Sequence, residues 1–323
     1  MATITLVDAV NQAISYEMAH DPDVIIFGED IAVNGGVFRT TVGLLEKFGP
    51  ERVLDTPLAE SMIAGMSIGM ASQGLKPIAE FQFSGFIYSA VDQILSHAAR
   101  LRNRTRGRLT CPVVYRAPYG GGIHAPEHHS ESMEALFAHI PGIRVVIPSS
   151  PLKAYGLLLA AIRNPDPVLF LEPKRIYRLI KQEVPDNGEA LPLDKCFIAK
   201  EGDDVTLIAW GAMMKETIEA AEQLENEGVS VEVLDLATIS PIDTNTILSS
   251  VEKTGRCVIV QEGPRTCGVS AEIAAQLCEY AFDSLKAPVQ RVTGYDTIMP
   301  YAQLEKSYMP SVERILKAVR AII

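Results

Sequence analysis

Val24-Ile25-Ile26-Phe27 is a short apolar run between Asp23 and Gly28, as expected of a strand buried on both faces. Four further runs of this kind follow, at 77–81, 113–116, 145–147 and 168–171. Longer stretches with helical patterns separate them. The alternation predicts a parallel sheet of the α/β class.

A second α/β series follows a change in composition. Its elements are predicted at 205–210 (strand), 217–227 (helix), 229–234 (strand), 242–254 (helix) and 257–261 (strand). The polar, proline-containing stretch 182–189 precedes this series and is typical of a linker. We therefore predict a first domain at 1–182, a linker at 183–203 and a second domain at 204–323.

Bulk properties narrow the function classes. The chain has 323 residues, enough for two domains, and is 47% hydrophobic with a net charge of −11. This acidic surface repels phosphate backbones, so no nucleic-acid partner is expected. Neither a targeting peptide nor an apolar stretch of roughly 20 residues is visible, so we expect no membrane association and a cytoplasmic location. Five scattered cysteines favour neither disulfides nor a zinc site.

Glu60 is the first candidate for chemistry. It ends the segment Asp55-Thr56-Pro57-Leu58-Ala59-Glu60, which is predicted to start a helix. The simplest interpretation is that Glu60 complements the helix dipole, worth about 0.3–1 kcal/mol. However, residues 62–75 carry no charge, which predicts a buried helix. A carboxylate at the mouth of such a helix could share a proton near neutral pH.

A second candidate is the loop from Gly120 to Ser132, which holds three of the six histidines. Three interpretations remain open: metal ligation by His124, His128 and His129, acid/base work by one histidine, or a merely polar loop. Pro126 lies between His124 and His128, so a helical metal motif does not fit. Imidazole titrates near neutral pH, which favours acid/base work over metal binding.

An ordered set of motifs carries a resemblance that covers essentially the whole chain. The motifs are Gly28-Glu29-Asp30, Asp55 to Glu60, Phe81-Gln82-Phe83-Ser84-Gly85-Phe86, Asp92-Gln93, His129-Ser130, Pro141-Gly142, Glu172-Pro173-Lys174, Tyr177-Arg178 and Gly294-Tyr295-Asp296-Thr297. Together they resemble the beta subunits of 2-oxo acid dehydrogenase complexes, which are transketolase-like enzymes that depend on thiamine diphosphate. The resemblance implies a transketolase-like pyrimidine-binding domain followed by a transketolase C-terminal-type α/β domain.

The resemblance also implies roles at matching positions. Glu60 is similar to the glutamate that hydrogen-bonds N1′ of the cofactor's aminopyrimidine and relays its proton. Phe86, Leu58 and Gln82 match positions that line the pyrimidine pocket, although core packing is the simpler interpretation of Phe86. His129 matches a histidine on the substrate side, which stabilises charge or assists acyl transfer.

Further ligands and partners follow from the same resemblance. Many relatives hold a potassium ion mainly through main-chain oxygens, and the matching positions are Val113, Ala161, Ile162, Asn164 and Asp166. In this chain Asn164 and Asp166 are exchanged relative to the usual family pattern. The chain contains no Gly-Asp-Gly segment, with which such enzymes hold Mg²⁺ and the diphosphate. We therefore expect an alpha subunit to supply those ligands, in an assembly of two alpha and two beta chains.

The resemblance favours an enzyme that decarboxylates pyruvate and passes the acetyl group to lipoamide on a lipoyl acyltransferase core. A branched-chain 2-oxo acid is the alternative small-molecule substrate. Two other classes stay open at this stage: a docking scaffold without catalytic groups, for which the apolar end 315–323 offers a surface, and a metal-dependent hydrolase built on the histidine loop.

Overall fold

Residues 2–323 are described by the computed structural model, in which they divide into two units. Unit 1 comprises the residues up to Tyr119 together with Leu136–Leu193. Unit 2 comprises Gly120–Ala135 and Asp194–Ile323, so the histidine loop belongs to unit 2. Each unit is α/β, which confirms the predicted fold class.

The sheet of unit 1 contains five of its strands where the sequence predicts them. Its strands run in the order β6-β7-β5-β4-β2-β3, and all of these neighbours are parallel. Their bounds are β2 Val24–Gly28, β3 Val53–Asp55, β4 Lys76–Glu80, β5 Val114–Tyr119, β6 Arg144–Val146 and β7 Val168–Pro173. All residues of β2, β5 and β7 are buried, as expected of strands covered on both faces.

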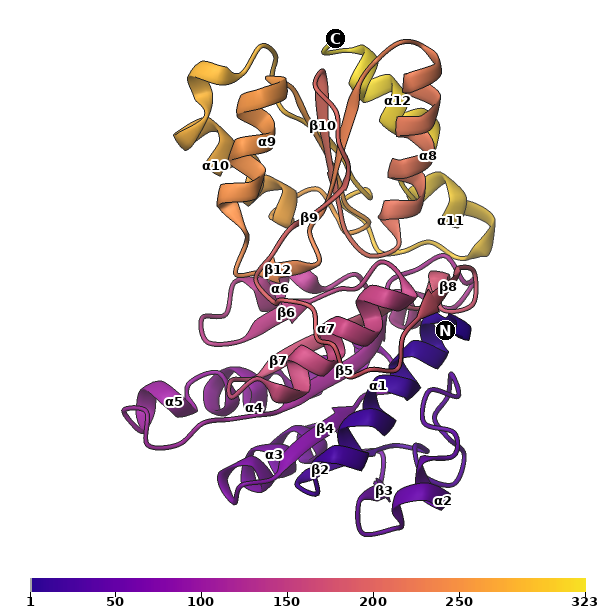
Figure 1. The fold of residues 1–323 in the computed structure, drawn as a ribbon, viewed down its shortest axis with the longest axis vertical. Coiled ribbons are helices and arrows are strands. Elements are labelled where there is room, and N and C mark those ends of the chain that lie inside the picture. Colours follow the sequence, from indigo (N-terminus) through magenta and orange to yellow (C-terminus); the bar gives the residue numbers. More distant parts are fainter. Residues whose placement is uncertain (1) are drawn as a thin grey trace. The chain divides into compact units, whose positions relative to one another are not determined.

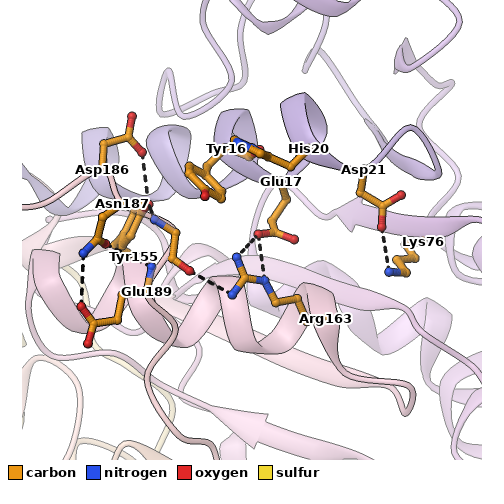
Figure 2. Close-up of polar contacts among 11 residues, drawn as sticks. Tyr16, Glu17, His20, Asp21, Lys76, Tyr155, Arg163, Asp186, Asn187 and Glu189 are labelled. Carbon is orange, nitrogen blue, oxygen red and sulfur yellow. Dashed lines mark hydrogen bonds and ion pairs between the residues drawn. The ribbon is translucent and has the colours of Figure 1, made fainter.

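Two helices that run in the same direction cover one face of this sheet, α1 (Leu6–His20) and α7 (Pro151–Arg163), and they lie side by side in Figure 1. Thr5 and Asp8 form a capping box at the start of α1. Figure 2 shows Arg163 of α7 reaching the buried carboxylate of Glu17 in α1, with its Nη2 2.6 Å from Oε1. Charge-assisted hydrogen bonds therefore fix the two helices against each other.

Helix α3 (Glu60–Ser72) begins at Glu60, as predicted. The prediction that it is buried is only half right. Its inward face holds Ile63, Ala64, Ser67 and Ala71, while Met62 is 40% exposed. The charge-free sequence therefore gives this chain an exposed apolar helix face, not an enclosed helix.

Shorter elements complete unit 1. They are β1 Ala2–Thr5, α2 Leu44–Phe48, α4 Val91–Gln93, α5 Leu101–Arg104 and β8 Lys181–Val184, with α6 Glu134–Ala138 beginning in the last residues of the unit 2 loop segment. Strands β1 and β8 pair antiparallel.

Unit 2 is a second layered α/β structure. Its sheet runs β14-β13-β10-β11-β9, parallel except for β9, which pairs antiparallel with β11. Helices α8 and α12 cover one face and α9 and α10 the other (Figure 1). The bounds are β9 Phe197–Lys200, β10 Val205–Ala209, α8 Met213–Asn226, β11 Val231–Asp235, β12 Thr238–Ser240, α9 Thr244–Thr254, β13 Cys257–Val260, α10 Val269–Tyr280, β14 Gln290–Val292, α11 Ala302–Tyr308 and α12 Val312–Arg320.

The stretch 183–203, expected to be a linker, contains the end of β8 and the whole of β9. None of the helices within residues 2–323 has the length and apolarity that a membrane crossing requires.

Candidate functional site

The carboxyl ends of β2, β3 and β4 place polar side chains along one edge of the unit 1 sheet. Open parallel sheets bind ligands outside this edge. Asp30 follows β2 and accepts a hydrogen bond of 3.0 Å from the Nε2 of Gln82, which follows β4. Asp55, at the end of β3, accepts backbone hydrogen bonds from Ala32 and Val33 and so holds the loop after Asp30. The edge is therefore built by contacts between separate strands.

Glu60 lies at the same edge, in the first turn of α3. It is partly buried, and the Ser89 hydroxyl lies 3.4 Å from its Oε2 and 3.2 Å from the carbonyl oxygen of Phe86. Leu58, two residues before Glu60, is 77% exposed. Ser89 thus links Glu60 to the segment that carries Phe86, whose ring packs edge-on against Phe83 at 5.5 Å.

Glu29 is a buried carboxylate beside Glu60. Burial raises the pKa of Glu29, and the negative charges of Glu60 and Asp30 raise it further, against a hydrogen bond from the Ala59 backbone. Its Oε1 is buried and has no hydrogen-bond partner among residues 2–323. A carboxyl group in the setting of Glu29 favours its protonated form.

A second set of charges lies further along the same edge, around Arg116 at the centre of β5. Arg116 is fully buried and donates to Glu172 of β7 at 2.7 and 2.8 Å and to Glu80 of β4. Tyr177 donates to Glu172 at 2.6 Å. Burial raises the pKa of Glu80 to about 7, with the charge of Arg116 opposing the shift and that of Glu172 adding to it.

The histidine loop belongs to unit 2 and is described with it. His129 is partly buried and ends a 3-10 turn over Glu127–His129, which is closed by a bond from its backbone N–H to Pro126. His124 and His128 are exposed. Across residues 2–323, no group of three or more His, Cys, Asp or Glu side chains is arranged to hold a metal ion.

The positions matched to a potassium site come together in unit 1, at the end of α7 and the start of β5. The Asn164 side chain accepts from the backbone of Asp166 at 2.9 Å, and the Asp166 carboxylate pairs with Arg102 at 2.5 Å. With these side chains engaged, cation binding would depend on carbonyl groups. The end of a helix supplies such carbonyls, because its last four lack intrahelical partners and carry partial negative charge.

Both domains match known families. Residues 2–180 match the transketolase pyrimidine-binding domain, and residues 194–315 match the transketolase C-terminal domain. The chain is 52% identical over 322 residues to the pyruvate dehydrogenase E1 component subunit beta of Acholeplasma laidlawii, covering 100% of this chain and 98% of that one. It is 46% identical over 323 residues to the Bacillus subtilis subunit of the same name, covering 100% and 99%.

The chain belongs to the family of pyruvate dehydrogenase E1 beta subunits. A solved structure described as a split gene transketolase, inactive beta4 tetramer, shares the fold with a TM-score of 0.82 over 99% of this chain and 98% of that one, at 24% identity. These relatives confirm the resemblance drawn from the motifs.

The structure brings Glu60, Phe86 and Gln82 to one edge of unit 1, and it leaves Leu58 exposed beside them. His129 lies in the other unit.

Sequence reasoning missed the buried network of Glu80, Arg116 and Glu172. A signal was present, because Glu80 lies within one predicted apolar run and Arg116 ends another, and such charges need a partner when buried.

Proposed function

We propose that this chain is the catalytic beta subunit of a pyruvate dehydrogenase E1 component. With an alpha subunit it decarboxylates pyruvate and transfers the acetyl group to lipoamide on a lipoyl acyltransferase. The observation that carries the proposal is the identity of about half of all residues with such beta subunits over the full length of both domains. A partial domain match would support only a shared fold.

Thiamine diphosphate fits the edge of unit 1 at its pyrimidine end. The fit rests on a buried Glu29 oxygen without a hydrogen-bond partner in the described part of the chain, a partly buried Glu60, and apolar Leu58 and Phe86 beside them. When bound, the cofactor supplies the nucleophilic carbon and the electron sink for decarboxylation. Within this chain, Glu60 holds and returns one proton at the pyrimidine N1′, Phe86 and Leu58 exclude water from the ring, and Gln82 orients Asp30.

Glu29 supports this role of Glu60. Burial and the negative charge of Glu60 close by raise the pKa of Glu29, so its carboxyl group holds a proton more readily than an exposed glutamate does. General acid/base transfer of this kind contributes roughly 10²- to 10⁴-fold to a rate.

The remaining ligands come from a partner. The chain offers no Gly-Asp-Gly segment for Mg²⁺, and its exposed α3 face, with Met62, Gly65 and Gly69, lets another backbone approach closely. We infer that an alpha chain holds Mg²⁺ and the diphosphate, in an assembly of two alpha and two beta chains. Carbonyls of Val113, Ala161, Ile162, Asn164 and Asp166 would hold a potassium ion, and His129 would act on the substrate side of the cofactor.

Co-expression with its alpha chain tests the proposal. Thiamine diphosphate binding with Mg²⁺ is measured by calorimetry on each chain alone and on the pair, and lipoamide reduction is measured with pyruvate and with 3-methyl-2-oxobutanoate. We expect tight binding and turnover only in the pair, with preference for pyruvate. Turnover by this chain unaided would overturn the split site, and strong preference for 3-methyl-2-oxobutanoate would overturn the substrate.

A further inference from the structure

The loop that carries His129 has a strained entrance. Gly120 and Gly122 adopt positive φ angles of 82° and 84°, and His124, which is not a glycine, also lies in the left-handed region at φ 60°. A side chain in this region is unfavourable unless surrounding contacts hold it there. The contacts that hold this entrance therefore decide the path of the loop.

Glu305, in the middle of α11, supplies the first set of contacts. Its carboxylate is 2% exposed and accepts hydrogen bonds from the Gly122 N–H at 2.7 Å and the His124 N–H at 3.2 Å. The Nδ1 of His124 lies 2.8 Å from the same carboxylate. One buried anion thus holds both backbone and side chain of the strained residue, through the stronger, charge-assisted type of hydrogen bond.

Glu262, which follows β13, supplies a second set. It is 3% exposed and accepts from the Gly121 N–H and, at 2.9 Å, from the Ser132 hydroxyl, so it joins the two ends of the loop. A Cβ atom at Gly120 would lie only 2.7 Å from Glu262 Oε1. Gly120 therefore leaves the space that the Glu262 carboxylate occupies beside the backbone.

A third contact holds the turn that contains His129. The Tyr301 hydroxyl donates a hydrogen bond to the Glu127 carboxylate, and this bond raises the pKa of Tyr301. Because Glu127 and His129 share one closed 3-10 turn, fixing one end of the turn restricts the other. The loop is thus held on both sides of Pro126 by the short segment 301–305.

We propose that Glu305, assisted by Glu262, is a positioning residue that sets the location of His129 during acyl transfer to lipoamide. The inference rests on the proposed function, in which His129 acts on the substrate side. Glu305 does not touch the substrate. It acts by fixing the left-handed His124 five residues before His129, and small displacements of a catalytic group are costly to rate.

The test compares Glu305→Gln with Asp243→Asn in the alpha–beta tetramer. The glutamine keeps the shape but replaces one acceptor oxygen with an NH₂ group that faces N–H donors. Asp243 is a matched control, because it is also a buried unit 2 carboxylate that accepts from a backbone N–H, that of Cys196 at 3.1 Å, and from a hydroxyl, that of Thr246 at 2.8 Å, away from the loop. Hydrogen exchange of the 120–132 peptides and steady-state kinetics with pyruvate and lipoamide are measured.

In Glu305→Gln we expect exchange of the Gly122 and His124 amides to accelerate roughly tenfold or more. We also expect kcat to fall roughly tenfold, with KM for pyruvate and thiamine diphosphate affinity within about twofold of the parent. Asp243→Asn should change neither the amide exchange of the loop nor kcat. Unchanged exchange, or a loss shared equally by KM and cofactor affinity, would overturn the positioning role.

His124→Asn is the second variant, used if Glu305→Gln does not assemble. Asparagine tolerates the left-handed conformation and keeps the amide donor, so it removes the imidazole contact alone. We expect smaller changes in the same two quantities, and parent-like exchange and kcat would contradict the proposal. Hydrogen exchange does not depend on turnover, so a parent tetramer inactive with pyruvate would refute the proposed function while the exchange data still judge the Glu305 contacts.

Discussion

Two pairs of carboxylates lie along the same edge of the unit 1 sheet, and they differ in the charges and hydrogen-bond donors that face them. Glu80 and Glu172 flank Arg116, which donates to both, and Tyr177 adds a further donor. Glu29 and Glu60 are acted on by negative charges instead, because Asp30 lies beside them and one Glu29 oxygen has no partner within residues 2–323.

This difference in hydrogen-bond donors distinguishes a pair with a structural role from a pair suited to acid/base chemistry. A buried carboxylate whose acceptors are all used is fixed in place, and losing its partner is costly. A carboxylate pair short of donors keeps its proton mobile, which is the property of a general acid/base site. We propose that in this molecule the Arg116 network forms the frame and that Glu29 with Glu60 forms the exchanging pair.

The largest effect should come from the exchanging pair. Glu60→Gln keeps the shape but cannot relay a proton, so kcat for lipoamide reduction in the alpha–beta tetramer should fall roughly 10²- to 10⁴-fold. Steady-state kinetics and a thermal melt check this, with the exposed Glu46→Gln as the control. Near-normal turnover in Glu60→Gln would leave this chain as a scaffold.

Substitutions in the Arg116 network should change the free energy of unfolding more than they change the rate of turnover. Arg116→Met removes the cation and leaves two carboxylates buried, which should lower the free energy of unfolding by about 3–5 kcal/mol. Chemical denaturation followed by circular dichroism measures the change. Adding Glu80→Gln to Arg116→Met should recover part of the loss, since it removes one of the two buried acids left without the cation. A further loss in the double variant would contradict the assignment of the network as frame.

The sequence predicts the repeating pattern of this fold well, because buried parallel strands such as 24–27 and 168–171 are apolar throughout and need no distant information. The start of α3 at Glu60 follows equally from local signals. The candidate site is harder to predict from the sequence. Arg116 meets partners 36 and 56 positions away, and Glu305 meets His124 181 positions away, so topology decides these contacts. The exposed face of α3 was also missed, because residues 62–75 contain no charged residue to mark it.

The smallest effect concerns the pH dependence of stability. It tests the protonation of Glu80, a carboxyl group of the Arg116 network. The pKa of Glu80 is raised to about 7 in the folded chain from its ordinary value of about 4.5, chiefly by burial. The folded state therefore binds more protons than the unfolded state between these values, and the stability contributed by protonated Glu80 is present below about pH 4.5 and lost as the pH rises to about 7.

We expect the free energy of unfolding of the parent to fall relative to Glu80→Gln by up to about 1.4 kcal/mol for each pH unit across this window. Urea denaturation at half-unit steps from pH 5 to 7.5 measures the difference. Glu29→Gln should show the same sign, because burial also raises the pKa of Glu29. Parallel curves for the parent and Glu80→Gln would mean that Arg116 holds Glu80 ionised throughout, and the two pairs would then differ in charge as well as in donors.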